Sequence, residues 1–374
     1  MRGIYIHIPF CVQKCNYCNF VSYKMNDENA KQYIKALEGE IKKTYANDKA
    51  DTVYIGGGTP TALGEELLES LFKCIKKNIN ISPDCEFTVE ANPKTVTADK
   101  CNIMKEYGVN RISLGAQSFN DGELKFLGRI HTAYDTEYTY NLLRQKGFNN
   151  INLDLMFGLP CSNAQTLKTS IKKYISLNPE HISCYGLTAE HGTAYKKAIE
   201  SKKIKELGED DFAEMYNIVC KSLKDGGYMQ YELSNFARDG FESKHNIKYW
   251  TQCEYYGFGA AAAGFLDGIR YVNTAKVREY TDCAVQGLDI PKSERYKMSK
   301  DEQMSEFVVL GLRLTQTGAD KKLFYKKFGV FTDDVFGDVI EKYTRLGFMD
   351  STDGHIVLKP NAYYVSNAIL CDFM

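Results

Sequence analysis

Short apolar runs that alternate with helical patterns constrain the fold of this chain more than any other feature. Helical patterns cover residues 30–44, 65–79, 133–145 and 165–176. Between them lie runs rich in Ile, Val, Leu and Tyr, at residues 4–8, 52–55, 86–91, 111–116, 151–157 and 181–187. Nearly continuous apolar runs indicate parallel strands that are covered on both faces. The alternation predicts an α/β sheet or barrel with right-handed crossovers, and six units favour an incomplete barrel.

The pattern loosens after residue 187. We expect a helix at 212–223, an extended run at 228–236 and a tight Gly- and Ala-rich segment at 255–265. A polar, charged stretch at 291–300 is interpreted as a linker, which divides the chain into domains 1–290 and 291–374. In the second domain, helices near 301–314, 320–328 and 333–346 precede a possible hairpin at 348–358. This order predicts a small winged-helix-like α+β domain.

Composition excludes several classes of protein. The formal net charge of -1 gives no overall basic field for nucleic acid. No apolar run approaches the length of a membrane span, and the first residues lack the layout of a secretory signal. We therefore expect a cytoplasmic protein, whose 12 cysteines stay reduced and do not form a disulfide framework.

Three of these cysteines, Cys11, Cys15 and Cys18, stand close together directly after the first predicted strand. A short loop with three thiols can bind one face of an iron–sulfur cluster, and a four-iron cluster with three protein ligands keeps one iron open. A zinc site is the competing interpretation, and it needs a fourth ligand, for which His7 is the candidate. The polar residues between the cysteines argue against simple packing in a core.

Polar residues also stand at the carboxyl ends of the predicted strands, where α/β proteins gather their chemistry. Glu90, Gln117 and Asp154 interrupt apolar runs, and buried carboxylates need partners. Each of these three residues alone could be a structural residue whose hydrogen bonds are made within the protein. Several of them at the same edge of the sheet favour a ligand-binding site. Arg129 offers a planar guanidinium suited to a carboxylate, with a surface arginine as the alternative.

A run of glycines, Gly56-Gly57-Gly58-Thr59-Pro60, follows the second predicted strand. Consecutive glycines let a backbone approach a ligand closely, and proline fixes the exit of the loop. Alone, this run also fits a plain strand-to-helix turn. Its position beside the cysteine loop favours ligand binding.

The spacing Cys-x3-Cys-x2-Cys after a first strand resembles the signature of the radical S-adenosylmethionine (SAM) superfamily. The resemblance implies a radical SAM partial (β/α)6 barrel, a 4Fe-4S cluster on the three cysteines, and SAM on the open iron. In this family an electron from the cluster cleaves SAM to methionine and a 5′-deoxyadenosyl radical. The positions that the resemblance assigns to SAM are Tyr5, Gly57, Gly58, Thr59, Glu90, Gln117, Arg129 and Asp154.

Further motifs resemble the branch of oxygen-independent coproporphyrinogen III oxidases and their relatives, among them Glu-Ala-Asn-Pro at 90–93 and Leu-Gly-Arg-Ile-His at 127–131. True oxidases of this branch carry a further cysteine where this chain has Phe20, and a longer segment before the cysteine loop. The run His245-Asn246-Ile-Lys-Tyr249-Trp250 instead resembles the hallmark of the HemW-type heme chaperones. A capped turn with a core Tyr–Trp pair is the plainer interpretation of that run.

The resemblance implies that His245 binds heme and that the protein delivers heme to an acceptor, such as a respiratory enzyme. It also implies an electron donor such as a flavodoxin or ferredoxin, a homodimer as one option, and contact with a membrane only through a partner. The alternative is a radical enzyme that acts on a porphyrinogen. One departure stands out, because Ala263 occupies the place of a histidine that the chaperones usually carry.

Overall fold

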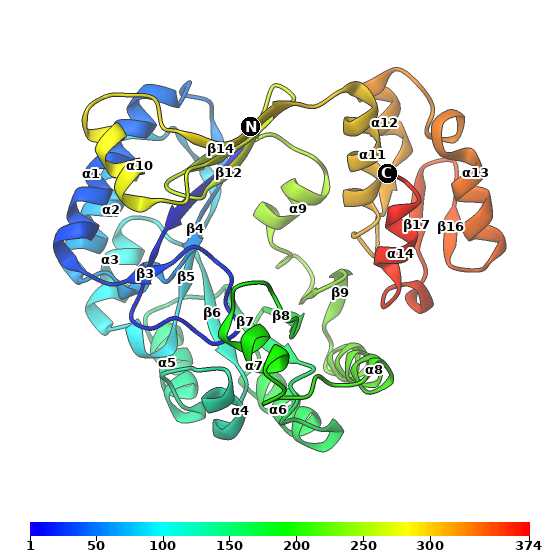
Figure 1. Ribbon diagram of the computed structural model, residues 1–374, viewed down its shortest axis with the longest axis horizontal. Helices are drawn as coiled ribbons and strands as arrows, with labels where there is room; N and C mark the ends of the chain where they lie inside the picture. The colour runs from blue at the N-terminus through cyan, green and yellow to red at the C-terminus, as the bar shows by residue number, and fades with distance from the viewer.

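Seven neighbouring parallel strands form the curved wall of the larger part of the molecule (Figure 1). The computed structural model describes all residues, 1–374. In spatial order the strands are β11 (Tyr255–Phe258), β1 (Arg2–Ile8), β4 (Ala50–Gly57), β5 (Ile81–Ala91), β6 (Arg111–Gln117), β7 (Ile151–Phe157) and β8 (His181–Gly186). The six predicted strands are all present, and the predicted α/β class is confirmed. The seventh strand, β11, joins from the Gly- and Ala-rich segment.

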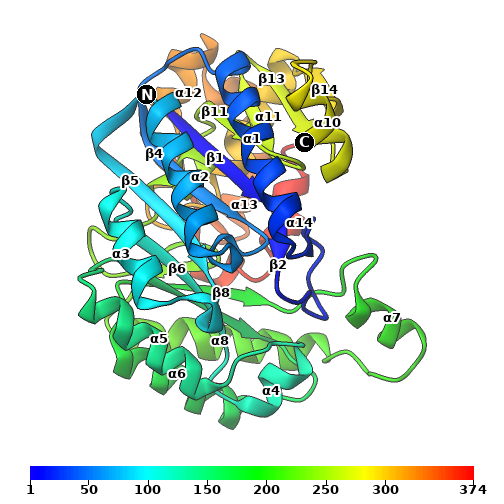
Figure 2. The ribbon, with the colours of Figure 1, turned by 90° about the vertical axis from the view of Figure 1, so that its left-hand side faces the viewer.

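Helices connect the strands and cover the outer face of the sheet (Figure 2). They are α1 (Asp27–Thr44), α2 (Glu65–Asn78), α3 (Ala98–Glu106), α4 (Asp121–Phe126), α5 (Ala133–Gln145) and α6 (Ala164–Leu177). Asn or Thr side chains cap most of these helices, for example Asn163, which accepts from the backbone N–H groups of Gln165 and Thr166. Two-residue strands β2 (Phe10–Cys11) and β3 (Tyr23–Lys24) flank the cysteine loop.

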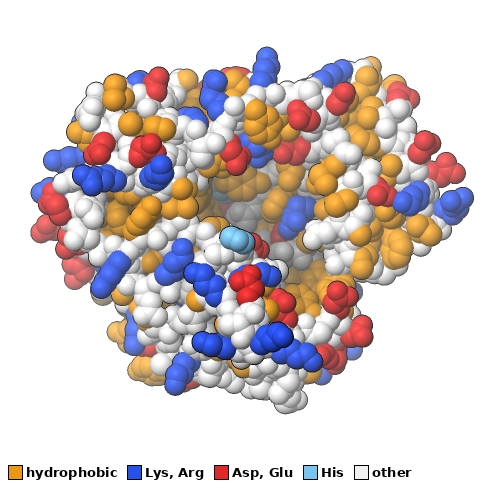
Figure 3. Space-filling view, in the orientation of Figure 1, with side chains coloured by type: hydrophobic (Ala, Val, Ile, Leu, Met, Phe, Trp, Pro, Cys, Tyr) orange, Lys and Arg blue, Asp and Glu red, His pale blue; other side chains and the backbone are white.

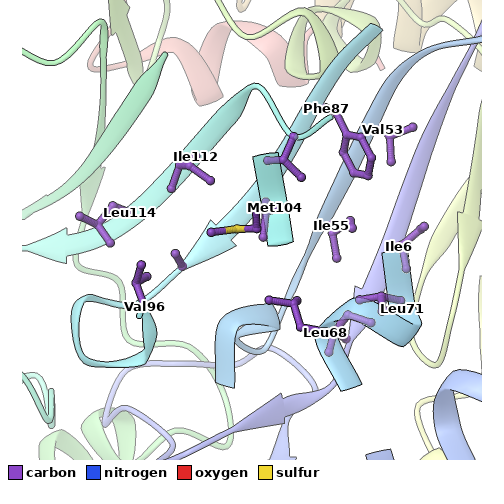
Figure 4. Packing of buried hydrophobic residues seen from close by; sticks show 14 of the residues in the cluster. Ile6, Val53, Ile55, Leu68, Leu71, Phe87, Val96, Met104, Ile112 and Leu114 are labelled. Carbon is purple, nitrogen blue, oxygen red and sulfur yellow. The ribbon is translucent and has the colours of Figure 1, made fainter. Parts of the chain in front are cut away.

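The two faces of the parallel strands differ in chemistry. Val53 and Ile55 of β4 face outward and pack with Leu68 and Leu71 of α2 in the main core (Figure 4). Every second residue faces inward, and on β6 and β7 these inward residues are mostly polar: Arg111, Ser113, Gln117, Asn152 and Asp154. The strands are buried on both faces, as expected, but on β6 and β7 the cover of the inner face is a largely polar cavity wall.

Antiparallel strands extend the sheet at both edges to a total of 12 strands. After β8 the chain forms α7 (Ala194–Glu200), α8 (Glu209–Asp225), β9 (Met229–Glu232) and β10 (Asn235–Ala237). The opposite edge carries β12 (Ala263–Leu266), β13 (Ile269–Asn273) and β14 (Lys292–Lys297), with α10 (Val277–Val285) between the last two. The predicted linker at 291–300 is wrong in this respect, because most of it is the edge strand β14.

The C-terminal residues form a smaller body with its own hydrophobic core, on the right of Figure 1. It contains α11 (Lys300–Gly311), α12 (Lys321–Phe328), α13 (Thr332–Arg345) and α14 (Ser366–Cys371). The predicted hairpin is present as β16 (Met349–Ser351) and β17 (His355–Leu358), and β15 (Ala319–Asp320) completes a three-stranded sheet. Helix α9 (Lys244–Trp250) lies between this body and the barrel (Figure 1).

Candidate functional site

A cavity of about 460 Å³ opens at the carboxyl ends of the parallel strands. We call it the first cavity, and Figure 3 shows the molecule hollowed near the centre of one face. Ten of the predicted site residues line it: Cys11, Cys15, Cys18, Gly57, Gly58, Thr59, Glu90, Gln117, Arg129 and Asp154. Residues from four parallel strands, from the cysteine loop and from the segment after α4 therefore converge on one space, as the sequence predicted for a strand-end site.

The cysteine loop, residues 11–18, covers one side of the first cavity. Its three thiols are free and half-buried, and burial raises the pKa of Cys11 and of Cys18. Asn16 binds the loop to the C-terminal end of α4, because its backbone N–H donates to the Leu127 carbonyl at 3.0 Å and its Nδ2 donates to the Phe126 carbonyl at 2.8 Å. The thiols thus face the cavity from a fixed loop.

The structure has no group of three His, Cys, Asp or Glu side chains placed to hold one metal ion. The zinc interpretation also loses its fourth ligand, since His7 contacts the Tyr5 hydroxyl at 3.0 Å and the Val21 carbonyl at 2.9 Å. A cluster binds each thiolate through a different iron, so its ligands need not converge on one point. Three free thiols on one cavity wall, without a fourth protein ligand, fit a four-iron cluster with one open iron.

The sequence suggested that the glycine run lets a ligand approach the backbone, but in the structure other parts of the protein lie close to all three glycines. A Cβ on Gly56 would lie 2.7 Å from the Glu90 carboxyl group, and one on Gly58 would lie 2.6 Å from the Phe10 carbonyl oxygen. Gly57 has φ +109, which favours glycine, and a Cβ there would lie 2.5 Å from the His7 ring. The positive φ of Gly57 and the backbone beside Gly58 therefore require glycine at those two positions, and the Glu90 carboxyl group favours it at Gly56.

Two half-buried carboxyl groups face the interior of the cavity. Burial raises the pKa of Glu90 to about 7, although Glu90 accepts hydrogen bonds from the Tyr54 hydroxyl at 2.8 Å and the Gly57 N–H at 3.0 Å. Burial also raises the pKa of Asp154 to about 6, and Asn152 Nδ2 donates to it at 2.7 Å. Desolvated carboxyls with these pKa values are typical of ligand-binding sites.

Arg129 joins the cysteine loop to the rim of the barrel. Its guanidinium donates to the Gly115 carbonyl at 2.7 Å, to Asn92, and to Cys15 Sγ at 3.3 Å. Asn92 in turn donates to Thr59 Oγ1 at 2.7 Å, and that hydroxyl lies 3.6 Å from Cys11 Sγ. The predicted surface alternative for Arg129 is wrong, since this chain of contacts holds it beside two of the thiols.

Tyr5 and His245 are the predicted site residues that do not line the first cavity. His245 is buried, and its ring nitrogens contact Thr52 Oγ1 and the Tyr249 hydroxyl, each at 2.8 Å. Burial lowers its pKa to about 3. We therefore correct the expectation that His245 ligates heme iron, because neither nitrogen is free in this structure and the ring is enclosed.

A second cavity, of about 530 Å³, lies beside the segment 19–21 that follows the cysteine loop. Asn19 and Phe20 line both cavities. The walls of the second are mostly apolar and include Tyr5, His7, Val21, Tyr249, Trp250, Cys253, Tyr255, Ala263, Phe265 and Arg270. Ala263, where the expected histidine is missing, faces this cavity. The hallmark run therefore contributes Tyr249 and Trp250 to it, and not His245.

Sequence reasoning missed other residues of the first cavity. Ser113, Asn152 and Ser183 lie within strands, Arg111 begins β6, and Tyr54 donates a hydrogen bond to Glu90. A signal for them was present, because polar residues recur at every second position of β6, β7 and β8. Asn246, from the hallmark run, also reaches this cavity.

Comparison with known proteins places the chain among radical SAM proteins. The family model "Radical SAM superfamily" matches residues 5–173, and "HemN C-terminal domain" matches residues 298–365. A Bacillus subtilis protein called heme chaperone HemW is 38% identical over all of this chain and 99% of its own length. Proteins of the same name from Lactococcus lactis and Escherichia coli are 35% and 36% identical, covering 100% and 74% of this chain and 97% and 74% of their own lengths.

A solved structure shares the whole architecture. Coproporphyrinogen III oxidase (HemN) from Escherichia coli superimposes with a TM-score of 0.86, covering 99% of this chain and 89% of its own. Its sequence is 21% identical, so the likeness establishes the fold alone. No helix of this protein is long and apolar enough to span a bilayer.

Proposed function

Because the chain belongs to the HemW family of heme chaperones within the radical SAM superfamily, we propose that it binds heme and transfers it to an acceptor protein. In this proposal Cys11, Cys15 and Cys18 hold a 4Fe-4S cluster, and SAM occupies the first cavity. An acceptor such as a respiratory enzyme and a reductant such as a flavodoxin or ferredoxin complete the proposed set of partners.

The residues of the first cavity fit these cofactors. When bound, the cluster and SAM supply a one-electron route to an organic radical. Arg129, beside Cys15, is suited to the carboxylate of SAM, and the carboxyls of Glu90 and Asp154 are suited to its cationic and hydroxyl groups. Thr59 and Asn92 hold Cys11 and Arg129 in position through their hydrogen bonds.

The observation that carries the heme proposal is the second cavity. It lies against residues 19–21, which directly follow the cysteine loop, its walls are mostly apolar, and its volume of about 530 Å³ falls in the range of cofactor sites. Tyr249, Trp250 and Phe265 provide aromatic surfaces for a porphyrin face, and Arg270 provides a cation for a carboxylate. Cys253 is the thiol in this wall, and thiolates ligate heme iron.

A heme titration of the purified chain tests the proposal. We expect saturable binding with a shift of the Soret band, weakened by Cys253→Ser. Ala263→His places an imidazole in the second cavity, so we expect at least tenfold tighter binding and a further Soret shift. Ala46→His, on the exposed surface, is the matched control and should change neither quantity. Binding that saturates equally in all these variants, or no binding, would contradict heme in this cavity.

The competing function is oxidation of a porphyrinogen. Phe20 is 64% exposed and lies between the two cavities, at the position where the related oxidases carry a further cysteine. We expect no protoporphyrinogen from the reconstituted protein incubated with coproporphyrinogen III, SAM and a reductant. Product formation at a rate well above that of cluster-free protein would decide for the enzyme.

A further inference from the structure

Arg111 is buried in the barrel interior without a partner. It begins β6, is 2% exposed and lines the first cavity. Its Nε is enclosed and unpaired, and no other residue forms a hydrogen bond or ion pair with its guanidinium. Arg129, at the rim of the same cavity, instead donates to Asn92, Gly115 and Cys15. The Nε of Arg129 is unpaired as well, so the two arginines differ in their terminal nitrogens, which have protein partners only in Arg129.

The carboxyl groups of Glu90 and Asp154 lie close enough to Arg111 for its charge to lower their pKa values, but neither forms a hydrogen bond with it. Glu90 is bonded to Tyr54 and to the Gly57 backbone, and Asp154 is bonded to Asn152. Burial raises the pKa of Glu90 to about 7 and that of Asp154 to about 6. Both carboxyls therefore carry a proton for part of the time near neutral pH, which leaves the guanidinium charge only partly balanced.

A buried cation without a hydrogen-bonded partner is costly for a folded protein. Such costs persist where a ligand completes the site, because a preorganised guanidinium then binds an anion without reorganisation. A guanidinium presents two parallel donors that match the two oxygens of a carboxylate. The first cavity gives Arg111 the access that such a ligand needs.

We propose that Arg111 binds a carboxylate of a ligand at the floor of the first cavity. A strand rises about 3.3 Å per residue, so Arg111 starts roughly 20 Å below Gln117 at the rim of β6. The cavity thus offers two guanidinium groups at different depths, Arg129 by the thiols and Arg111 below. The carboxylate has two possible sources, SAM itself or an acidic porphyrin-type ligand, and the experiment separates them.

The first arm measures thermal stability of the full-length, ligand-free protein. Arg111→Met removes an unpaired buried charge at similar volume, so we expect Tm to rise by about 1–3 °C. Arg144→Met is the matched control, because Arg144 bonds the Tyr140 hydroxyl and pairs with Glu180 at 2.8 Å. That variant should lower Tm. A lower Tm in Arg111→Met as well would assign Arg111 a structural role and overturn the proposal.

The second arm measures binding to wild-type, Arg111→Met and Arg111→Lys proteins. The probes are SAM with decarboxylated SAM, and coproporphyrin III with its tetramethyl ester. We expect Arg111→Met to lower the affinity for one carboxylate-bearing probe at least tenfold, and the affinity for its carboxylate-free counterpart less than twofold. Arg111→Lys should retain part of that affinity. Equal losses within each pair, or no loss in either, would overturn the proposal whether or not the protein binds heme.

Discussion

At the scale of single residues, Glu90 shows how burial sets the response of a site to pH. Burial is the main reason that its pKa is about 7, and the hydrogen bonds from Tyr54 and Gly57 only moderate the shift. A carboxyl whose pKa is raised in the folded state binds more protons than the unfolded chain does between about pH 4.5 and 7. The ligand-free protein should therefore lose stability as pH rises through that window.

We expect SAM affinity to have the opposite pH dependence, because SAM carries positive charge and prefers ionised carboxyls. Affinity should rise by up to about tenfold per pH unit between pH 5.5 and 7, then level off. Glu90→Gln should remove the part of the rise near pH 7, whereas Asp154→Asn should remove the part near pH 6. Equilibrium binding of SAM to the reconstituted protein across this range is the measurement. A flat profile in the wild-type protein would rule out both carboxyls as contacts.

At the scale of elements, α9 contains the hallmark run and is bound to the barrel strands by hydrogen bonds and an ion pair. The Glu86 carboxylate accepts from the backbone N–H groups of Lys244 and His245 at 3.0 Å each, and Lys248 pairs with Asp51 at 2.8 Å. The His245 ring stacks on Tyr54 with centroids 5.2 Å apart, and Tyr54 holds Glu90. His245 is thus a positioning residue, which supports a side of the first cavity through Tyr54.

His245→Ala should therefore lower stability and change heme ligation little. Loss of two buried hydrogen bonds and of the ring packing predicts a decrease of about 2–3 kcal/mol in the free energy of unfolding. Urea denaturation measures this, and the Soret maximum of the heme-loaded variant should stay within a few nanometres of wild type. His191→Ala, at an exposed loop position, is the control and should alter neither. A lost Soret shift at unchanged stability would restore His245 as an iron ligand.

Local sequence patterns predicted some elements well and others poorly, for physical reasons. Strands β7 and β8 and helix α5 match their predicted ranges closely, because apolar runs and capping signals are local. The edge strand β14, with the sequence Lys-Ser-Glu-Arg-Tyr-Lys, is mostly exposed and carries no apolar signal, so it looked like a linker. Tyr249 is a local partner of His245, but its other partners, Thr52 and Tyr54, are nearly 200 residues away in the chain, and no local pattern reveals them.

At the scale of the whole molecule, the sequence motifs located the first cavity but not the second. The first cavity is lined by the carboxyl ends of parallel strands, which always lie at the same edge of such a sheet. The second needs α9, β11 to β13 and the C-terminal body to meet beside residues 19–21, and Glu306 and Leu310 of α11 are the contribution of that body. This arrangement depends on packing between the two bodies, and local residue patterns do not predict such packing.

The contact between the two bodies is specific. Leu233 N–H donates to the Arg313 carbonyl at 3.1 Å, and Thr315 N–H donates to the Tyr231 carbonyl at 3.0 Å. The Arg313 guanidinium lies 4.4 Å from the centre of the Trp250 ring and 3.5 Å from the carboxylate of the fully buried Glu232. Arg313 therefore joins the C-terminal body to both the hallmark run and the barrel edge.

We expect the wild-type chain to unfold in one calorimetric transition, since these bonds couple the two bodies. Arg313→Ala leaves Glu232 buried without its cation, at a cost of about 3 kcal/mol, and removes the contact with Trp250. The C-terminal body should then unfold first, as a separate transition at lower temperature. Arg345→Ala, on the exposed surface of α13, should keep the single transition at the wild-type temperature. Because α11 also forms part of the second cavity, the affinity for heme should fall in Arg313→Ala while the affinity for SAM is unchanged. A loss of both affinities would place the effect in the barrel instead.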